Sequence, residues 1–80
     1  MEIIKKIDGN VCNVALEGRL DTTTAPQLEA ELKNSLNDVT ELVFDFSKLE
    51  YISSAGLRVL LAAQKVMNAQ GSMKITNVAP

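Results

Sequence analysis

Two adjacent hydroxyl groups, those of Ser53 and Ser54, are the side chains of this sequence best suited to chemistry. They belong to a run of mostly small residues at the expected start of a long helix, Ile52-Ser53-Ser54-Ala55-Gly56-Leu57. The first turn of a helix has free N–H groups and a partial positive charge, so it favours an anion. A phosphate on one of these serines would add about −1.5 to −2 charges to the surface. The same residues also suit a purely structural role, because serines commonly cap helices and a glycine permits close helix–sheet packing.

Catalysis by this chain alone is not expected. The sequence has no histidine and a single cysteine, Cys12, so a Ser-His pair, a Cys-His pair and a Cys/His zinc site are excluded. Ser54 could be combined with Asp21 and Asp45, but such a group lacks a general base tuned near neutral pH. Lys48 is the only amine nearby, and the glycine-rich phosphate-binding motifs are absent. We therefore expect a binding module that is not an enzyme and that uses no cofactor or metal.

Composition limits the chain to a small globular class. Its 80 residues suffice for one domain, with 46% hydrophobic and 22% charged residues. A net charge of −2 with scattered lysines and arginines argues against nucleic acid as a partner. No signal peptide is expected, and the longest apolar run, residues 59–63, is too short to cross a bilayer. We expect a cytoplasmic protein in which Cys12 is a buried thiol.

Hydrophobic periodicity divides the chain into six elements in the order β-β-α-β-α-β. The expected strands are residues 2–7, 11–17, 42–46 and 72–78, and the expected helices run from the cap Thr24 to Asn37-Asp38 and from Ser53 or Ser54 to about Gln70. Because strand–helix–strand units join parallel neighbours by right-handed crossovers, the last three strands should be parallel. This order predicts an α/β fold with a mixed four-stranded sheet and an N-terminal hairpin.

Several details follow from the same pattern. Gln27 is expected to complete a capping box with Thr24, and Gly71 to end the second helix in a left-handed conformation. The apolar spacing predicts a buried stripe on each helix, formed by Leu28, Leu32 and Leu36 on the first and by Val59, Leu60, Ala63, Val66 and Met67 on the second. The strand at 42–46 has apolar residues on both sides, which predicts cover on two faces or an exposed end only. Asp45 is therefore expected at the carboxyl end of that strand, followed by a loop over residues 47–52.

Two polar loops are expected to lie together. Residues 18–24 follow the second strand and residues 45–56 follow the third. In an open α/β sheet, ligands and partners bind outside the carboxyl ends of parallel strands. The sequence therefore predicts a binding surface at this end of the sheet.

Two blocks of sequence resemble a known family. The first is Leu16-Glu17-Gly18-Arg19-Leu20-Asp21 with Ala25 and Leu28, and the second joins Val43-Phe44-Asp45-Phe46-Ser47 to Ile52-Ser53-Ser54-Ala55-Gly56-Leu57-Arg58-Val59-Leu60. In type, spacing and order, these residues resemble the STAS domain of bacterial anti-sigma factor antagonists over essentially the whole chain. The resemblance implies one STAS-like domain over residues 1–80.

The resemblance also implies a mechanism. Members of the family bind an anti-sigma factor that is also a GHKL-type serine kinase, and this binding frees a sigma factor. The kinase inactivates the antagonist by phosphorylating a serine at this helix start, and a PP2C-type phosphatase restores it. By position the acceptor is Ser54, two residues before Gly56, with Asp21 beside it. The implied partner-binding residues are Asp21, Thr22, Thr23, Ser53, Ser54, Ala55, Gly56, Leu57, Arg58 and Leu61.

One departure from the family leaves alternatives open at the serines. Many members have an aspartate where this chain has Ser53, so Ser53 could be the acceptor, or phosphorylation could be absent. Without the switch, the chain would be a constitutive interaction subunit, for example beside an ABC-transporter ATPase in lipid transport, and Ser54 would be only a cap. The family also leaves a weak nucleotide site near Asp21 and Ser54 open.

The second departure is at the C-terminus. The family usually continues past the fourth strand into a helical segment, which is lacking here, so the domain is expected to be short at its C-terminal end. Apolar surface left exposed there favours self-association, and a homodimer is expected, for example by strand exchange.

Overall fold

The computed structural model describes residues 1–78, which form a four-stranded sheet and two helices. The elements are β1 (Glu2–Asp8), β2 (Val11–Leu20), α1 (Ala25–Ser35), β3 (Glu41–Ile52), α2 (Ser54–Gln70) and β4 (Ser72–Thr76). The strands lie in the order β1-β2-β3-β4, with β1 antiparallel to β2 and the other pairs parallel. The predicted fold class, hairpin and strand directions are confirmed. The C-terminal end at Pro80, on which the predicted shortness depends, lies outside the described residues.

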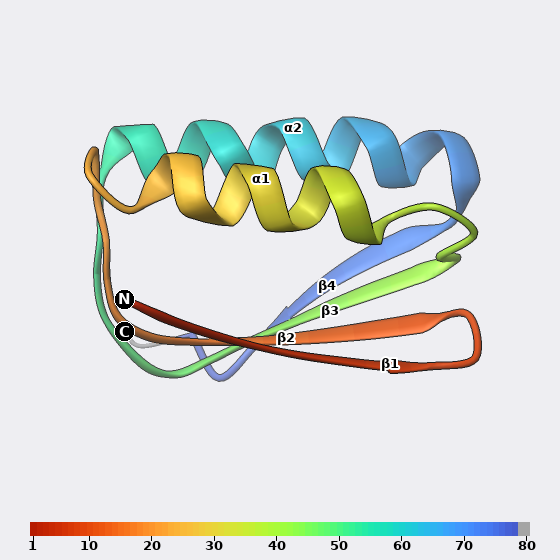
Figure 1. The fold of residues 1–80 in the computed structure, drawn as a ribbon, viewed down its shortest axis with the longest axis horizontal. Helices are drawn as coiled ribbons and strands as arrows, with labels where there is room; N and C mark the ends of the chain where they lie inside the picture. The colour runs from red at the N-terminus through yellow and green to blue at the C-terminus, as the bar shows by residue number, and fades with distance from the viewer. Residues whose placement is uncertain (79–80) are drawn as a thin grey trace.

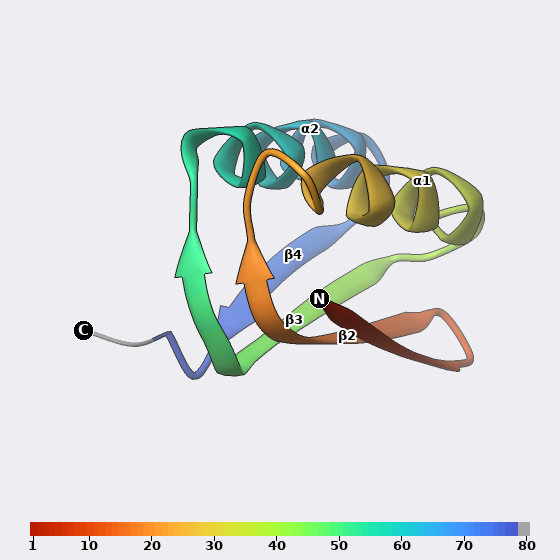
Figure 2. The same ribbon diagram turned by 60° about the vertical axis from the view of Figure 1, so that its left-hand side comes forward.

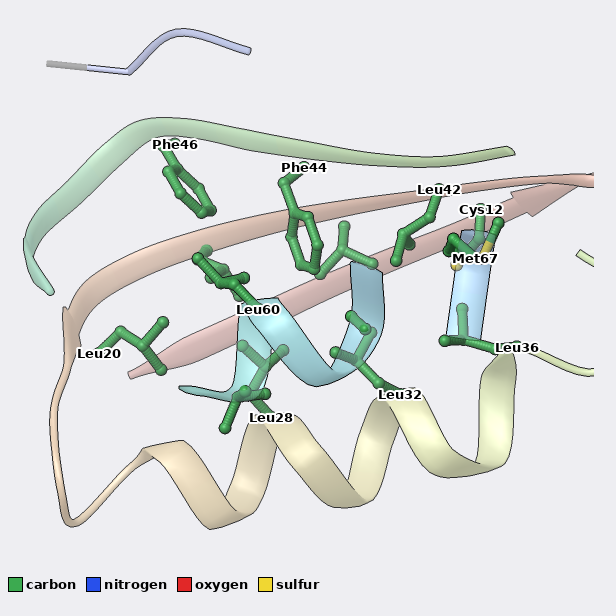
Figure 3. Close-up of a cluster of buried hydrophobic side chains, with 14 of the residues drawn as sticks. Cys12, Leu20, Leu28, Leu32, Leu36, Leu42, Phe44, Phe46, Leu60 and Met67 are labelled. Atoms are coloured by element: carbon green, nitrogen blue, oxygen red, sulfur yellow. The ribbon is translucent and has the colours of Figure 1, made fainter. Parts of the chain in front are cut away.

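Both helices cover the same face of the sheet (Figure 1). Their leucines meet the alternate side chains of β2 and β3 in one core, in which Leu28 of α1 and Met67 of α2 are fully buried with Phe44 (Figure 3). Cys12 belongs to this core, as predicted, and burial raises the pKa of its thiol. Removing this apolar surface from water is the main force that holds the helices on the sheet.

The N-terminal hairpin turns at Gly9 and Asn10, because Asp8 already pairs with Val11. Gly9 has a φ of +62°, a left-handed value that glycine adopts without steric cost. A positive φ at the first turn residue matches the twist of the two flanking strands. The turn therefore fixes the register that brings the apolar side chains of β2 to the helix side of the sheet.

The two central strands are longer than predicted. The register between β2 and β3 shifts between Ala15 and Glu17 and again between Gly18 and Arg19, each time leaving one extra residue on β3. Such bulges bend a strand, and the ends of β2 and β3 turn up toward the helices in Figure 2. The predictions of loops at residues 18–20 and 47–52 are wrong, because each bulge interrupts the alternation on which a strand prediction depends.

Asp45 lies in the middle of β3 and not at its carboxyl end, which corrects a second expectation. The face of the sheet opposite the helices is uncovered in the described chain, so Asp45 and Val43 are only half-buried there. The Asp45 carboxylate accepts hydrogen bonds from Asn77 Nδ2 and from the Ser47 N–H, each at 2.9 Å. These bonds lower the pKa of Asp45 and explain how the strand tolerates a charge.

Three helix details also differ from expectation. Thr24 occupies the cap position of α1, but within the described chain its hydroxyl caps no helical N–H, so the predicted capping box with Gln27 is wrong. Val66 is 44% exposed, although it was expected in the buried stripe of α2. Gly71 has an extended φ of 172°, not a left-handed one. A glycine is needed there because a Cβ would collide with the carbonyl group of Thr40.

Candidate functional site

The carboxyl ends of β2 and β3 lie side by side beneath the start of α2. Leu20 and Ile52, the last residues of these strands, are register partners. The Ser53 N–H then donates to the Leu20 carbonyl oxygen at 2.8 Å. This bond brings the turn that begins at Asp21 next to the first turn of α2, as both views of the ribbon show (Figures 1 and 2).

Ser53 is the residue that caps α2. It has extended backbone angles, and its hydroxyl oxygen accepts a hydrogen bond from the Gly56 N–H at 3.4 Å. Of the two serines considered as the cap, the structure selects Ser53. Its side chain is thereby occupied in holding the helix start, and the residue is half-buried.

Ser54 is the first residue of α2 and is exposed. Ser54 lies in the first helical turn, where the free N–H groups create a partial positive charge, and its side chain takes no part in the cap bond made by Ser53. An exposed hydroxyl in that field can accept a phosphoryl group without disturbing the core. Ser54 thus combines access with an electrostatic environment that favours an anion.

Asp21 organises the neighbouring turn. Its Oδ1 accepts hydrogen bonds from the N–H groups of Thr23 at 3.0 Å and Thr24 at 3.1 Å. The bond from Thr24 is the largest of several effects that lower the pKa of Asp21, so its carboxylate is charged at neutral pH. The Thr24 hydroxyl donates to the Arg19 carbonyl oxygen at 2.8 Å and accepts from the Asp21 N–H at 2.9 Å. These bonds fix a negative charge within the turn that follows β2.

Gly56 allows α2 to begin close to the sheet. A Cβ at this position would lie 2.7 Å from Leu20 Cγ and 3.0 Å from Ile52 Cγ1. Since both of those residues end the strands of the site, Gly56 sets the distance between the helix start and the Asp21 turn. Its contribution to the site is positional, because the residue itself is buried.

The remaining predicted partner-binding residues fall into three groups. Thr22 and Thr23 are exposed on the Asp21 turn, and Leu57, Arg58 and Leu61 are exposed along α2. Ala55 is half-buried and packs against the core, so it offers little surface to a partner. The structure therefore places the polar turn beside the first turn of α2, from which exposed side chains continue along the helix.

A pair of residues at this surface was missed from the sequence. The guanidinium carbon of Arg19 lies 4.4 Å from the centre of the Tyr51 ring, and Arg19 Nε is 3.8 Å from Asp21 Oδ2. A cation over an aromatic face is held by the ring's electrostatic quadrupole. Arg19 and Tyr51 are register partners on β2 and β3, so recognising that these strands continue past residues 17 and 46 would have revealed the pair.

The described residues do not form the catalytic group considered from the sequence, a metal site or a membrane-spanning helix. Asp45 does not join Ser54 and Asp21, because on the order of 20 Å of strand separates it from Ile52. Residues 1–78 contain no cluster of three or more metal-ligating His, Cys, Asp or Glu side chains. Neither α1 nor α2 is long and apolar enough to span a membrane.

Comparison with known proteins identifies the family. The family described as "Mlab, STAS domain" matches residues 4–80, which is nearly the whole chain. The chain belongs to the STAS domain family. The resemblance to the STAS domain of bacterial anti-sigma factor antagonists is thus confirmed.

Relatives of this STAS domain include a protein of Bordetella bronchiseptica, BtrV, named as an anti-sigma factor antagonist. The two are 40% identical over 77 residues, covering 94% of this chain and 66% of BtrV. An anti-sigma factor antagonist from Mycobacterium paratuberculosis is 27% identical with a TM-score of 0.83, covering 92% of this chain and 64% of that one. This STAS domain therefore spans about two thirds of the length of these relatives.

The fold also matches that of the anti-sigma factor antagonist SpoIIAA. The unphosphorylated form of SpoIIAA has a TM-score of 0.86 and 20% identity, covering 99% of this chain and 76% of that chain. SpoIIAA of Bacillus is also solved in a phosphorylated form, with a TM-score of 0.81. At this level of identity the likeness concerns the fold alone.

Proposed function

We propose that this STAS domain is an anti-sigma factor antagonist that binds an anti-sigma factor and so releases a sigma factor. The observation that carries the proposal is the Ser53–Leu20 hydrogen bond, which holds the Asp21 turn beside the start of α2 and its exposed side chains. The 40% identity with BtrV, which is named as an antagonist of this kind, supports the same function. The chain acts by binding, without chemistry of its own.

The proposal includes a phosphorylation switch at Ser54. The partner is a GHKL-type serine kinase that transfers the γ-phosphoryl group of ATP to the Ser54 hydroxyl oxygen. A new O–P bond forms, the bond between the γ-phosphorus and the bridging oxygen of ADP breaks, and the hydroxyl proton passes to a base on the kinase. A PP2C-type phosphatase returns the hydroxyl by hydrolysis.

Ser54 is favoured over Ser53 as the acceptor by the bonds that each residue makes. The Ser53 hydroxyl accepts from the Gly56 N–H, and phosphorylation there would have to break or replace the cap of α2. Ser54 is exposed and free of that cap. A dianion on Ser54 would reduce binding, because it must be desolvated where it meets the partner.

A second candidate function keeps the surface and omits the switch. Position 53 is a serine where many antagonists have an aspartate, and the matching family is described by the name Mlab. These observations favour a constitutive interaction subunit, for example beside an ABC-transporter ATPase in lipid transport. In that case the surface would bind its partner equally well in wild type and Ser54→Ala.

Phosphorylation mapping separates the two functions. The purified chain is incubated with ATP and each GHKL-type kinase of its source organism, and phosphate is located by mass spectrometry. Ser54→Ala and Ser53→Ala are treated in parallel, with circular dichroism as a check of folding. We expect one phosphate on Ser54, lost only in Ser54→Ala, and weaker kinase binding afterwards. If no kinase phosphorylates the chain, and wild type and Ser54→Ala bind the partner equally well, the switch is excluded and the constitutive interaction subunit is the remaining function.

Self-association is also part of the proposal. Ile75 on β4 and Val78 after it are exposed apolar side chains near the open edge of the sheet. A second copy of the chain would cover them and pair the free edge of β4. Sedimentation velocity over a range of concentrations tests this, and a species of monomer mass throughout would contradict it.

A further inference from the structure

The outer face of α2 has a regular pattern that the core does not require. Ser54, Arg58, Leu61 and Lys65 recur at intervals of three and four residues, so they lie on one side of the helix. All four are exposed, as is Leu57 beside them, and the buried side chains of α2 point the opposite way. Leu57 and Leu61 are 50% and 64% exposed. We call these five residues the outer α2 face.

The charge of the outer α2 face differs from that of the whole chain. The chain has a net charge of −2, but α2 contains no acidic residue, and its two charged side chains are Arg58 and Lys65. In the described chain the ion pairs join Lys5 to Glu31, Arg19 to Asp21 and Lys74 to Glu41, and none includes Arg58. Arg58 is therefore available to a group outside the domain, with the exposed side chains of Leu57 and Leu61 next to it on the helix.

We propose that Arg58 binds an acidic group on the partner, next to an apolar hollow that receives Leu57 and Leu61, and that a phosphate on Ser54 captures this same arginine. The inference rests on the proposed function, because it names the chemistry of the anti-sigma factor's contact surface and the residue through which phosphorylation acts. Complementary charge across an interface mainly sets its specificity and its rate of association.

Capture of Arg58 follows from helix geometry. Ser54 and Arg58 are four residues apart, and an acidic group N-terminal to a basic one at this spacing is the favourable orientation on a helix. The guanidinium group can donate two parallel hydrogen bonds to phosphate oxygens. Phosphorylation would therefore draw Arg58 away from the partner and into an ion pair within α2. The phosphate dianion would stay at the contact surface.

A lipid surface fits the outer α2 face less well than an acidic protein does. Two basic residues supply only a weak attraction to an anionic membrane. The rest of the amphipathic surface of α2 is already buried in the core, so the helix cannot insert its main apolar face. An acidic protein surface needs only the few exposed groups that are present.

The first test measures affinity for the kinase that binds the chain in the phosphorylation experiment. Arg58→Glu should weaken binding roughly tenfold or more, and the wild-type affinity should fall as salt is added. Lys33→Glu, which makes the same charge change at an exposed residue of α1, should leave the affinity unchanged. Equal binding by wild type and Arg58→Glu would overturn the inference and leave the proposed function standing. If no kinase binds the chain, both the inference and the proposed function are overturned.

The second test needs no kinase. Phosphoserine is incorporated at position 54 during synthesis, and the phosphate is titrated by ³¹P NMR in wild type, Arg58→Gln and Lys65→Gln. Arg58 should lower the second pKa of the phosphate by roughly 0.2–0.4 of a unit relative to Arg58→Gln, whereas Lys65→Gln should match wild type. Identical titrations in all three chains would overturn capture of Arg58.

Binding of the unmodified chain to phosphatidylglycerol vesicles, lost in Arg58→Glu, would overturn the acidic protein partner in favour of a membrane.

Discussion

The Ser53 N–H donates to the Leu20 carbonyl oxygen at 2.8 Å, so the residue that caps α2 is bonded to the last residue of β2. β2 and α2 are separated in sequence by α1 and β3, and this bond fixes their ends together. The Asp21 turn begins immediately after Leu20, and Ser54 follows immediately after Ser53. The two halves of the proposed surface are therefore positioned by backbone geometry, before any side chain of the surface makes a contact.

The two serines should differ in their effects on stability. Ser53→Ala removes the hydroxyl that accepts from the Gly56 N–H and should lower the free energy of unfolding by about 1 kcal/mol. Ser54→Ala changes an exposed side chain outside that cap and should stay within about 0.5 kcal/mol of wild type. Urea denaturation of both variants measures this difference. A larger loss for Ser54→Ala would show that Ser54 holds the helix start.

Gly56→Ala should destabilise the domain even though alanine is normally the better helix former by about 1 kcal/mol. The added methyl group would lie 2.7 Å from Leu20 Cγ, and crowding of this kind in a packed core costs about 1–3 kcal/mol. Leu20→Ala removes the crowded atom, so the double variant should lose less stability than the sum of the two single variants. Additive losses, measured by urea denaturation, would contradict a direct clash between the two side chains.

Asp21 should make the domain sensitive to acid. Hydrogen bonds, above all from the Thr24 N–H, lower its folded-state pKa below the ordinary value of 3.8. The charged carboxylate therefore contributes stability above that value, and the contribution is lost as the pH falls through the lowered pKa. Asp21→Asn should show a shallower loss of stability than wild type between about pH 5 and about pH 2 in urea titrations. An identical pH dependence in wild type and Asp21→Asn would contradict this role of the carboxylate.

The Cys12 thiol should be unreactive toward thiol reagents in the folded chain. Its side chain is fully buried, and burial raises its pKa, so little thiolate is formed or reached. A disulfide reagent such as DTNB should react with it only when the domain opens, and the rate should rise with added urea. Immediate reaction in native buffer would mean that β2 is exposed more often than the structure implies.

The fold class follows from the sequence because its signals are local and agree with one another. The leucines at 28, 32 and 36 mark the buried side of α1, and the Asp8-Gly9-Asn10 segment marks the hairpin. The association of the Asp21 turn with the start of α2 also follows, since the carboxyl ends of parallel strands meet at one edge. The resemblance to STAS domains added the choice of Ser54.

The remaining details depend on contacts between distant residues. The bulges of β3 shift its register against β2, and no pattern within β3 alone indicates them. Asp45 was expected at a strand end because a carboxylate is rarely buried without a partner, whereas it lies within β3 on the face that the helices leave uncovered. Arg19 and Tyr51 meet only because both strands continue past the bulges. The requirement for glycine at position 71 comes from a carbonyl group of Thr40, about thirty residues earlier in the chain.

The parallel pairing of β2 and β3 has a consequence for the rate at which the domain folds. Val11 pairs with Glu41 and Leu20 with Ile52, so partners along the centre of the sheet are about thirty residues apart. The hairpin of β1 and β2 can form from neighbouring residues, but the central pairing must first close a loop that contains all of α1. Folding should therefore be slower than in a helical bundle of similar length, and the β1–β2 hairpin should be available as an early template for β3.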